Sequence, residues 1–260
     1  PLLPKGVKGQ VDAGLGKTLS SGTVTLIAPT DLISRDHETR VVDGVEIVFL
    51  MAPDSEAPAE MHMFYPGFKC LNMAENAVHN FHNLLPFRGA EVRDSRAWSR
   101  YIDVALMTFG DRAEALIGQH HWPVWGTSVI KTYLAKQRDL YKYVHDQTLR
   151  LINHGHTPNE IAELLTLPDS LAHQWYARGY YGTVRHNAKA IYQKYLGWYD
   201  GNPAHLDPLP PADAARKYVD YFGGFDAALA KARADFAKGE YRWVAEIANH
   251  LVFADPANQE

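Results

Sequence analysis

The chain is poor in three features that would each assign it to a class of protein: cysteine, positive charge and long apolar runs. Its 260 residues include a single cysteine, Cys70, which excludes an internal disulfide framework and any zinc site built from several thiolates. Lys and Arg number 26 against 30 Asp and Glu, so there is no net positive field to bind a nucleic-acid backbone. No apolar run approaches about 18 residues, and we expect no membrane span. Any metal must therefore be bound by His and carboxylate side chains, and 13 histidines are available.

The N-terminal residues lack the pattern of a secretory signal. The chain begins with Pro1 rather than Met, and the opening PLLPKGVKGQ has no charged segment followed by an apolar one. We therefore expect an internal start within a longer parent chain, and we do not infer a compartment from this end.

The first half of the chain predicts an α/β layer structure. Residues 1–125 contain short apolar runs separated by Pro, Gly and Asp, and Asp43-Gly44 between two such runs is a strong hairpin signal. Residues 97–109 carry apolar side chains at helical spacing. Strands alternating with helices favour a layered sheet. The expected strands cover residues 24–29, 41–42, 45–50, 61–65, 69–73 and 113–117.

The second half, residues 126–260, predicts helices only. Thr157 and Glu160 have the spacing of a capping box, with Pro158 at the first helical position. The last two helices resemble a tetratricopeptide-type hairpin, although one hairpin does not make a repeat array. The expected helices cover residues 129–151, 161–165, 169–178, 185–197, 211–222, 225–237 and 239–251.

A glycine-rich segment near the N-terminus has an ordinary interpretation. Residues 14–18, GLGKT, end like a phosphate-binding loop, but Val11 stands where that pattern requires glycine. No strand precedes the segment either. We interpret it as a glycine-rich loop rather than a nucleotide site.

Three expected strands end in turns that carry a carboxylate or an imidazole. Glu56 follows residues 45–50, Glu75 follows 69–73, and His120 follows 113–117. Rigid strands of an α/β sheet hold such side chains still, and these side chains are suitable ligands for a borderline divalent metal. Glu60 lies in the same turn as Glu56 and is a rival ligand. Taken singly, each of these residues is equally consistent with a solvated loop.

Long blocks of the sequence carry a resemblance to a known family. The blocks are APAEM (57–61), MAEN (73–76), FRG (87–89), HHWPVWG (120–126), KQRDLYKYVHDQTLRL (136–151), GYYGTVRHNAKAIYQKYLGWYDGNPA (179–204) and PLPP (208–211). They resemble the alkyl sulfatases of the metallo-β-lactamase superfamily, and the order of strands and polar turns matches the second half of that fold, with Glu56 in place of a family histidine. This resemblance implies the second half of an αββα sandwich over residues 1–125 and an all-α dimerisation domain over 126–260.

The resemblance implies a site with two zinc ions. Glu56 would bind one ion, His120 the other, and Glu75 would lie between them. The family's His-x-His-x-Asp-His motif is absent from these 260 residues, so the remaining ligands would come from an upstream segment of the same parent protein. A metal-activated water would then hydrolyse alkyl sulfate esters such as dodecyl sulfate to alcohol and sulfate.

Four further residues are candidates for handling the substrate. Arg88 and Arg93 follow Glu75 in sequence and offer planar donors for a sulfate monoanion. His186 and Tyr181 are candidates to protonate the leaving group. The alternatives are two surface arginines and a packing histidine.

The other histidines and the aromatic residues of the second half favour structural roles. His79 and His82 are three residues apart, so one helix face would carry both, and we expect them and His121 to line a pocket or to pack. The resemblance further implies a homodimer through the helical half and a periplasmic or secreted location. Two other functions stay open: another metallo-β-lactamase-fold hydrolase of an anionic ester, and a non-catalytic helical interaction scaffold.

Overall fold

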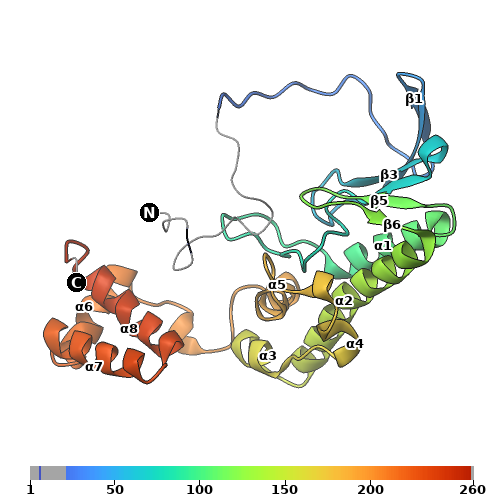
Figure 1. Cartoon of the computed structure of the whole chain (residues 1–260). Coiled ribbons are helices and arrows are strands. Elements are labelled where there is room, and N and C mark those ends of the chain that lie inside the picture. The colour runs from blue at the N-terminus through green and yellow to red at the C-terminus, as the bar shows by residue number, and fades with distance from the viewer. Residues whose placement is uncertain (1–5, 7–21, 259–260) are drawn as a thin grey trace. The chain divides into compact units, whose positions relative to one another are not determined.

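The computed structural model describes Gly6 and residues 22–258, which separate into two compact units. The first unit extends to Trp198 and the second begins at Tyr199 (Figure 1). Among the residues that the structure describes, no helix is both long and apolar enough to cross a lipid bilayer.

The first unit contains a six-stranded mixed sheet whose spatial order follows the chain order. All neighbouring strands pair antiparallel except β4 and β5, which are parallel and are joined through helix α1. The strands are β1 (Thr39–Val42), β2 (Val45–Met51), β3 (Met61–Tyr65), β4 (Cys70–Asn72), β5 (Ala115–Ile117) and β6 (Val124–Trp125).

The hairpin between β1 and β2 has the turn that its sequence predicts. Val42 pairs with Val45, so only Asp43 and Gly44 form the connection. Both have positive φ, 49° and 78°. A two-residue turn of this kind matches the twist of the flanking strands, and Asp-Gly adopts it at low cost.

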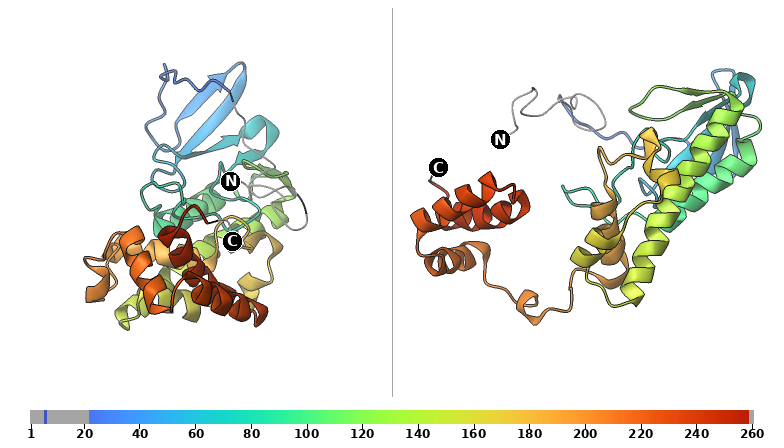
Figure 2. Two further views of the ribbon diagram at one scale, coloured as in Figure 1. Left: turned by 90° about the vertical axis from the view of Figure 1, so that its left-hand side faces the viewer. Right: turned by 60° about the horizontal axis from the view of Figure 1, so that its bottom comes forward.

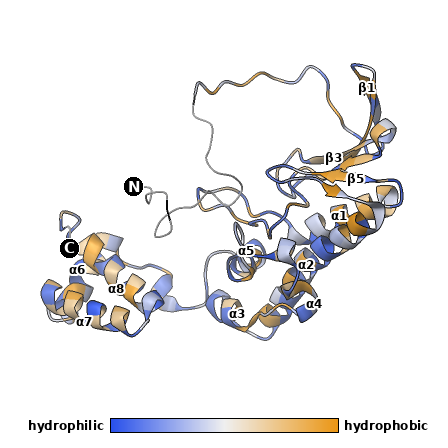
Figure 3. Cartoon of the chain, in the orientation of Figure 1, coloured by the Kyte–Doolittle hydropathy of each residue, from blue (hydrophilic) through white to orange (hydrophobic). Residues whose placement is uncertain are grey.

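Helices α1 (Ser95–Phe109) and α2 (Thr127–Asn153) lie side by side along one face of the sheet (Figure 1). Asp94 caps α1 by accepting the backbone N–H of Ala97 at 2.9 Å. The buried side chains of α1 recur every three or four residues, so one stripe faces the core. Hydrophobic residues accordingly alternate with hydrophilic ones along α1 and α2 (Figure 3). The stripe consists of Ser95, Trp98, Ser99, Ile102, Ala105 and Phe109.

Shorter helices complete the first unit. They are α3 (Pro158–Leu164), α4 (Asp169–Ala172) and α5 (Val184–Leu196), with a 3₁₀ turn at Trp175–Ala177. The predicted capping box is present, since Thr157 N–H donates to Glu160 Oε2 at 2.8 Å and Glu160 N–H donates back to Thr157 Oγ1. Because α2 packs against α1 and α5 in one core, residue 125 does not separate two compact units. The assignment of residues 1–125 and 126–260 to two family domains stays a prediction.

The second unit is a small helical bundle of α6 (Pro211–Tyr221), α7 (Phe225–Ala237) and α8 (Tyr241–Ala254) (Figure 2). Gly239, at φ 86°, lies in the turn between α7 and α8, as expected for a residue that ends a helix in the left-handed region. The core of this unit consists of Val219, Ala228, Ala232, Ile247 and Leu251.

Two expectations from the sequence need comment. The strand expected at residues 24–29 is wrong: this segment has no regular structure, and Val24 and Leu26 are 93% and 94% exposed. Its apolar residues have no neighbouring strand in the described chain, and a strand needs a partner for its backbone hydrogen bonds. The phosphate-loop-like segment at residues 14–18 lies outside the described residues.

Candidate metal centre

The candidate site is built from turns that follow three strands of the sheet. Glu56 follows β2, Glu75 follows β4, and His120 follows β5. Each turn contains a non-glycine residue in the left-handed region: Asp54 (φ 61°), Ala74 (φ 49°) and His120 itself (φ 74°). Such conformations cost about 1 kcal/mol or more each and persist only where the surrounding structure holds them. Their concentration at these three turns is typical of a functional site.

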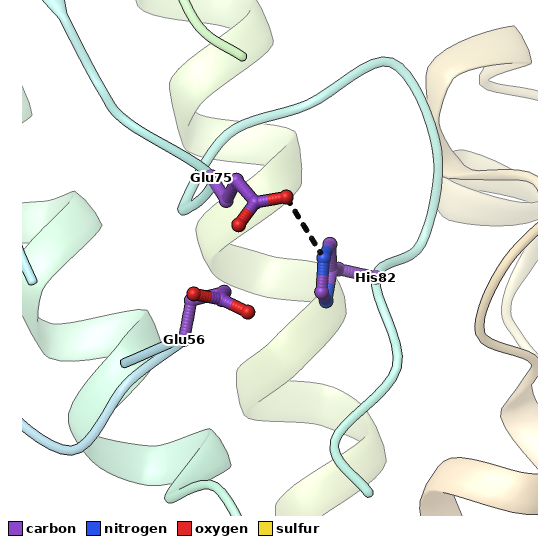
Figure 4. Close-up of side chains that lie close together, drawn as sticks. All are labelled: Glu56, Glu75 and His82. Carbon is purple, nitrogen blue, oxygen red and sulfur yellow. Dashed lines mark ion pairs between the residues drawn. The ribbon is translucent and has the colours of Figure 1, made fainter. Parts of the chain in front are cut away.

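The structure brings the predicted residues together. His120 Nε2 lies 2.6 Å from Glu75 Oε1. Ligand atoms of Glu56, Glu75 and His82 all lie within 4.8 Å of one another (Figure 4). The three residues predicted as ligands thus converge from separate strand ends, while their role as ligands stays a prediction. His82 joins them without having been predicted.

Glu75 is the centre of this cluster electrostatically. Burial alone would raise its pKa, but the nearby imidazoles of His82 and His120 outweigh this effect and lower the pKa to about 2. His82 Nε2 lies 3.6 Å from Glu75 Oε1, so two imidazoles face one carboxylate. Glu75 is therefore held as an anion, the form in which a carboxylate binds a cation.

Glu56 is oriented by Arg93. The Arg93 guanidinium forms an ion pair with the Glu56 carboxylate, and its Nε donates to the Glu56 backbone oxygen at 2.7 Å. Nη1 of Arg93 donates to both oxygens of Asn83. Most of the Arg93 donors are thus used within the chain, where they tie the Glu56 loop to the segment that carries His82. The predicted role of Arg93 in sulfate binding stays a prediction.

His82 is the functional candidate that the sequence analysis missed. The expectation that one helix face carries both His79 and His82 is wrong, because residues 76–83 have no regular structure. His82 Nδ1 lies 3.0 Å from the Asn83 backbone oxygen, and its buried Nε2 has no hydrogen-bond partner. The sequence signal was only the richness of residues 76–82 in Asn and His, and the structure adds that all seven residues are buried.

The donor set fits a borderline divalent metal. Two carboxylates and two imidazoles converge, and the Nε2 atom of His82 is a buried polar atom that faces Glu75 but makes no hydrogen bond. Buried polar groups are normally satisfied, so an unpartnered imidazole nitrogen facing carboxylates is expected where a cation binds. Imidazole with carboxylate is a common zinc ligand combination.

The predicted substrate-handling residues differ in their burial and in their contact with the cluster. Tyr181 packs edge-on against the His82 ring, with ring centres 4.9 Å apart. Arg88 is exposed, and its neighbour Phe87 stacks edge-on with the exposed His186 at 5.4 Å. Tyr181 therefore adjoins the candidate ligands directly, whereas Arg88 and His186 lie together on the surface.

Glu60, the alternative ligand to Glu56, lies beside the cluster, but its side chain forms a hydrogen bond with the backbone. Its Oε1 accepts the Glu75 backbone N–H at 3.1 Å, and the residue is only 9% exposed. Burial raises the pKa of Glu60 to about 7, helped by the negative charges of Glu56 and Glu75. Glu60 is not among the residues whose ligand atoms converge in the described chain.

Comparison with known proteins identifies relatives of the whole chain. A family model described as "Alkyl sulfatase dimerisation" matches residues 157–260. The chain is 57% identical to the alkyl/aryl-sulfatase BDS1 of Saccharomyces cerevisiae over 259 residues, all of this chain and 40% of that protein. It is 52% identical to a linear primary-alkylsulfatase of Pseudomonas sp, over 99% of this chain and 38% of that protein. The chain thus spans about 40% of the length of these relatives.

A solved structure agrees in fold. The stereoselective inverting sec-alkylsulfatase Pisa1 from Pseudomonas sp. superposes with a TM-score of 0.95 at 52% identity, over 98% of this chain and 41% of that one. The predicted fold class, an α/β structure followed by an all-helical part, is therefore confirmed, and the sheet is mixed. Nearly the whole chain is therefore similar to one segment of the alkyl sulfatases, and residues 157–260 match the alkyl sulfatase dimerisation family.

Proposed function

We propose that this chain is the part of a zinc-dependent alkyl sulfatase that supplies half of its metal site, and that the intact protein hydrolyses fatty alcohol sulfates such as dodecyl sulfate to alcohol and sulfate. The observation that carries the proposal is the convergence of Glu56, Glu75, His82 and His120 from separate segments. The names of relatives at 51–57% identity, all alkyl or alkyl/aryl sulfatases, support the substrate class.

The proposed site has two zinc ions. Glu56 would hold one ion and His120 the other, with Glu75 shared between them, and His82 is close enough to Glu75 to contribute. The remaining ligands would come from a segment outside these residues. Bound zinc would polarise the ester and lower the pKa of a bound water to about 7.

The residues of this chain then bind and protonate the substrate. Arg88 is the better placed arginine for the sulfate group, because it is exposed while Arg93 is occupied by Glu56 and Asn83. Tyr181, against His82, is the nearer candidate to give a proton to the leaving oxygen, and His186 is the alternative. The helices of residues 126–260 join two copies in a homodimer, which the match to a dimerisation family supports.

Sulfate release from dodecyl sulfate by the intact protein tests the proposal. We expect activity that is lost on chelation and restored by zinc, and that falls in His120→Ala together with zinc content. Arg88→Ala should lose turnover while retaining zinc, and Arg35→Ala, another exposed arginine of the first unit, should behave as wild type.

Two results would contradict the proposal. Turnover of another anionic ester but not of alkyl sulfates would leave a different hydrolase of the same fold. If the intact protein binds no zinc, both hydrolase functions fail and the helical scaffold remains.

A further inference from the structure

A buried network of hydrogen bonds connects the Glu56 loop to the Glu75 turn. Ser55 and Asn76, the chain neighbours of the two carboxylates, are both 0% exposed. Asn76 Nδ2 donates to Ser55 Oγ at 3.1 Å, and Ser55 Oγ donates to the Ala52 backbone oxygen at 2.6 Å. His62 Nε2 lies 2.7 Å from Asn76 Oδ1. With the His62 proton on Nε2, His62 donates to Asn76 Oδ1, Asn76 donates to Ser55, and Ser55 donates to the Ala52 backbone oxygen, so the three side chains form one connected chain of hydrogen bonds.

Glu60 makes a second tie between the same two turns. Its backbone closes the Glu56 loop, since its N–H donates to Ala57 and its carbonyl accepts from Ala52 at 2.9 Å. Its side chain reaches across to the Glu75 backbone N–H at 3.1 Å. One residue thus fixes the loop that carries the first carboxylate and the turn that carries the second.

These two ties hold backbone that is otherwise strained. Asp54 and Ala74, which precede the two carboxylates, have positive φ, a conformation that persists only when neighbouring contacts enforce it. Without the ties, each turn would relax independently, and the carboxylate separation would change.

We propose that Glu60 and Asn76 are positioning residues that set the separation of the Glu56 and Glu75 carboxylates for metal binding. Glu60 acts as a hydrogen-bond acceptor for the Glu75 amide, and Asn76 acts as the bridge between Ser55 and His62. The functional part of this inference rests on the proposed metal site, whereas the structural part concerns the turns alone.

Glu60→Gln and Glu60→Ala in the intact protein separate positioning from charge. Gln keeps an acceptor oxygen at the same reach, so we expect Glu60→Gln to retain zinc affinity and slow hydrogen exchange at the Glu75 amide. Glu60→Ala removes the acceptor, and we expect faster exchange at that amide and zinc affinity lower by about 10–100-fold, the usual effect of losing a residue that orients a ligand. Glu46→Gln, an exposed change on β2, is the matched control. Unchanged exchange at Ile102 in the core of α1 would show that the fold is intact.

Asn76 is tested in the same way. Asn76→Ala should speed exchange at the Glu75 amide and weaken zinc binding, because Ser55 and His62 lose their common partner.

Three results would overturn the proposal. The first is a zinc affinity in Glu60→Ala equal to that of the wild type. The second is an equal loss of zinc affinity in Glu60→Gln and Glu60→Ala, which would show that the charge of Glu60 matters rather than its acceptor oxygen. The third is unchanged hydrogen exchange at the Glu75 amide in both Glu60→Ala and Asn76→Ala. If the wild-type protein binds no zinc, the proposed function fails, and the exchange of the Glu75 amide still decides whether the two residues hold the turn.

Discussion

At the scale of single residues, the chain buries several imidazoles that are neutral. Burial lowers the pKa of His62 to about 4, although the hydrogen bond that His62 donates to Asn76 opposes this effect. Burial together with the nearby His121 lowers the pKa of His79 to about 4. A neutral imidazole has one donor and one acceptor, so the position of its proton is set by its partner. In His62 this partner belongs to the network beneath the carboxylates, and protonation there would place an unpaired charge in the core.

We therefore expect His62 to lower the free energy of unfolding in acid. The unfolded state takes up the proton near pH 6.5 and the folded state only near pH 4, so stability is complete above pH 6.5 and decreases as the pH falls to 4. A pKa shift of this size corresponds to a loss of about 3 kcal/mol of stability once the pH lies below the pKa of the folded state. Denaturant unfolding at pH 7.5 and 4.5 should show a smaller decrease in His62→Gln than in wild type.

The exposed His173 provides the control for this experiment. His173→Gln should retain the pH dependence of the wild-type protein. An equal decrease in wild type and His62→Gln would show that His62 is not the group that titrates.

At the scale of elements, the segment that carries His82 takes its shape from the helical part of the unit. Phe81 N–H donates to the Arg178 backbone oxygen, and Gly182 N–H donates to the Phe81 oxygen, both at 2.8 Å. The Asn187 side chain accepts from Leu84 N–H at 2.9 Å and donates to the His82 oxygen at 2.8 Å. An irregular segment thus obtains its backbone hydrogen bonds from residues about a hundred positions away, which is how it can be buried.

Gly182 is the tightest point of this contact and gives a second prediction. A Cβ at Gly182 would lie 2.5 Å from the His82 backbone oxygen, so Gly182→Ala must displace the segment that holds His82. We expect a loss of stability of about 1–3 kcal/mol, as for overpacked cores, together with weaker zinc binding. Gly67→Ala, with nothing within 4 Å, should change stability by less than about 0.5 kcal/mol. Equal stability of the two variants in denaturant unfolding would contradict this account of the contact.

The segment that carries His82 shows which features can be predicted from the sequence and which cannot. Helices such as α1 and the turn at Asp43-Gly44 were predicted because their signals are local: apolar spacing and turn chemistry. Glu56, Glu75 and His120 were predicted as a group because each follows an apolar strand. His82 was missed because its backbone partners are remote and leave no periodic pattern. The failed strand at residues 24–29 has the opposite cause, since local propensity without a partner strand does not make a strand.

At the scale of the whole molecule, the proposed metal site joins segments that are separated in sequence. Glu56, Glu75, His82 and His120 come from different turns and loops of the first unit, and Arg93 connects the Glu56 loop to the segment that carries His82. Binding of a cation by these residues is favourable only in the folded state, because the unfolded chain does not bring the residues together. Metal binding should therefore stabilise the first unit as a whole rather than one loop of it.

This coupling gives the last prediction. Zinc at about 100 times its dissociation constant adds about 2.7 kcal/mol to the stability of the folded state. For a domain of this size we expect the melting temperature to rise by about 5–10 °C. In Glu75→Gln the difference with and without zinc should vanish, because the central anion is lost, whereas Glu46→Gln should keep it. Comparing each variant with itself cancels any change in basal stability. A zinc-dependent rise in Glu75→Gln equal to that of the wild type would show that the stabilising cation binds elsewhere in the protein.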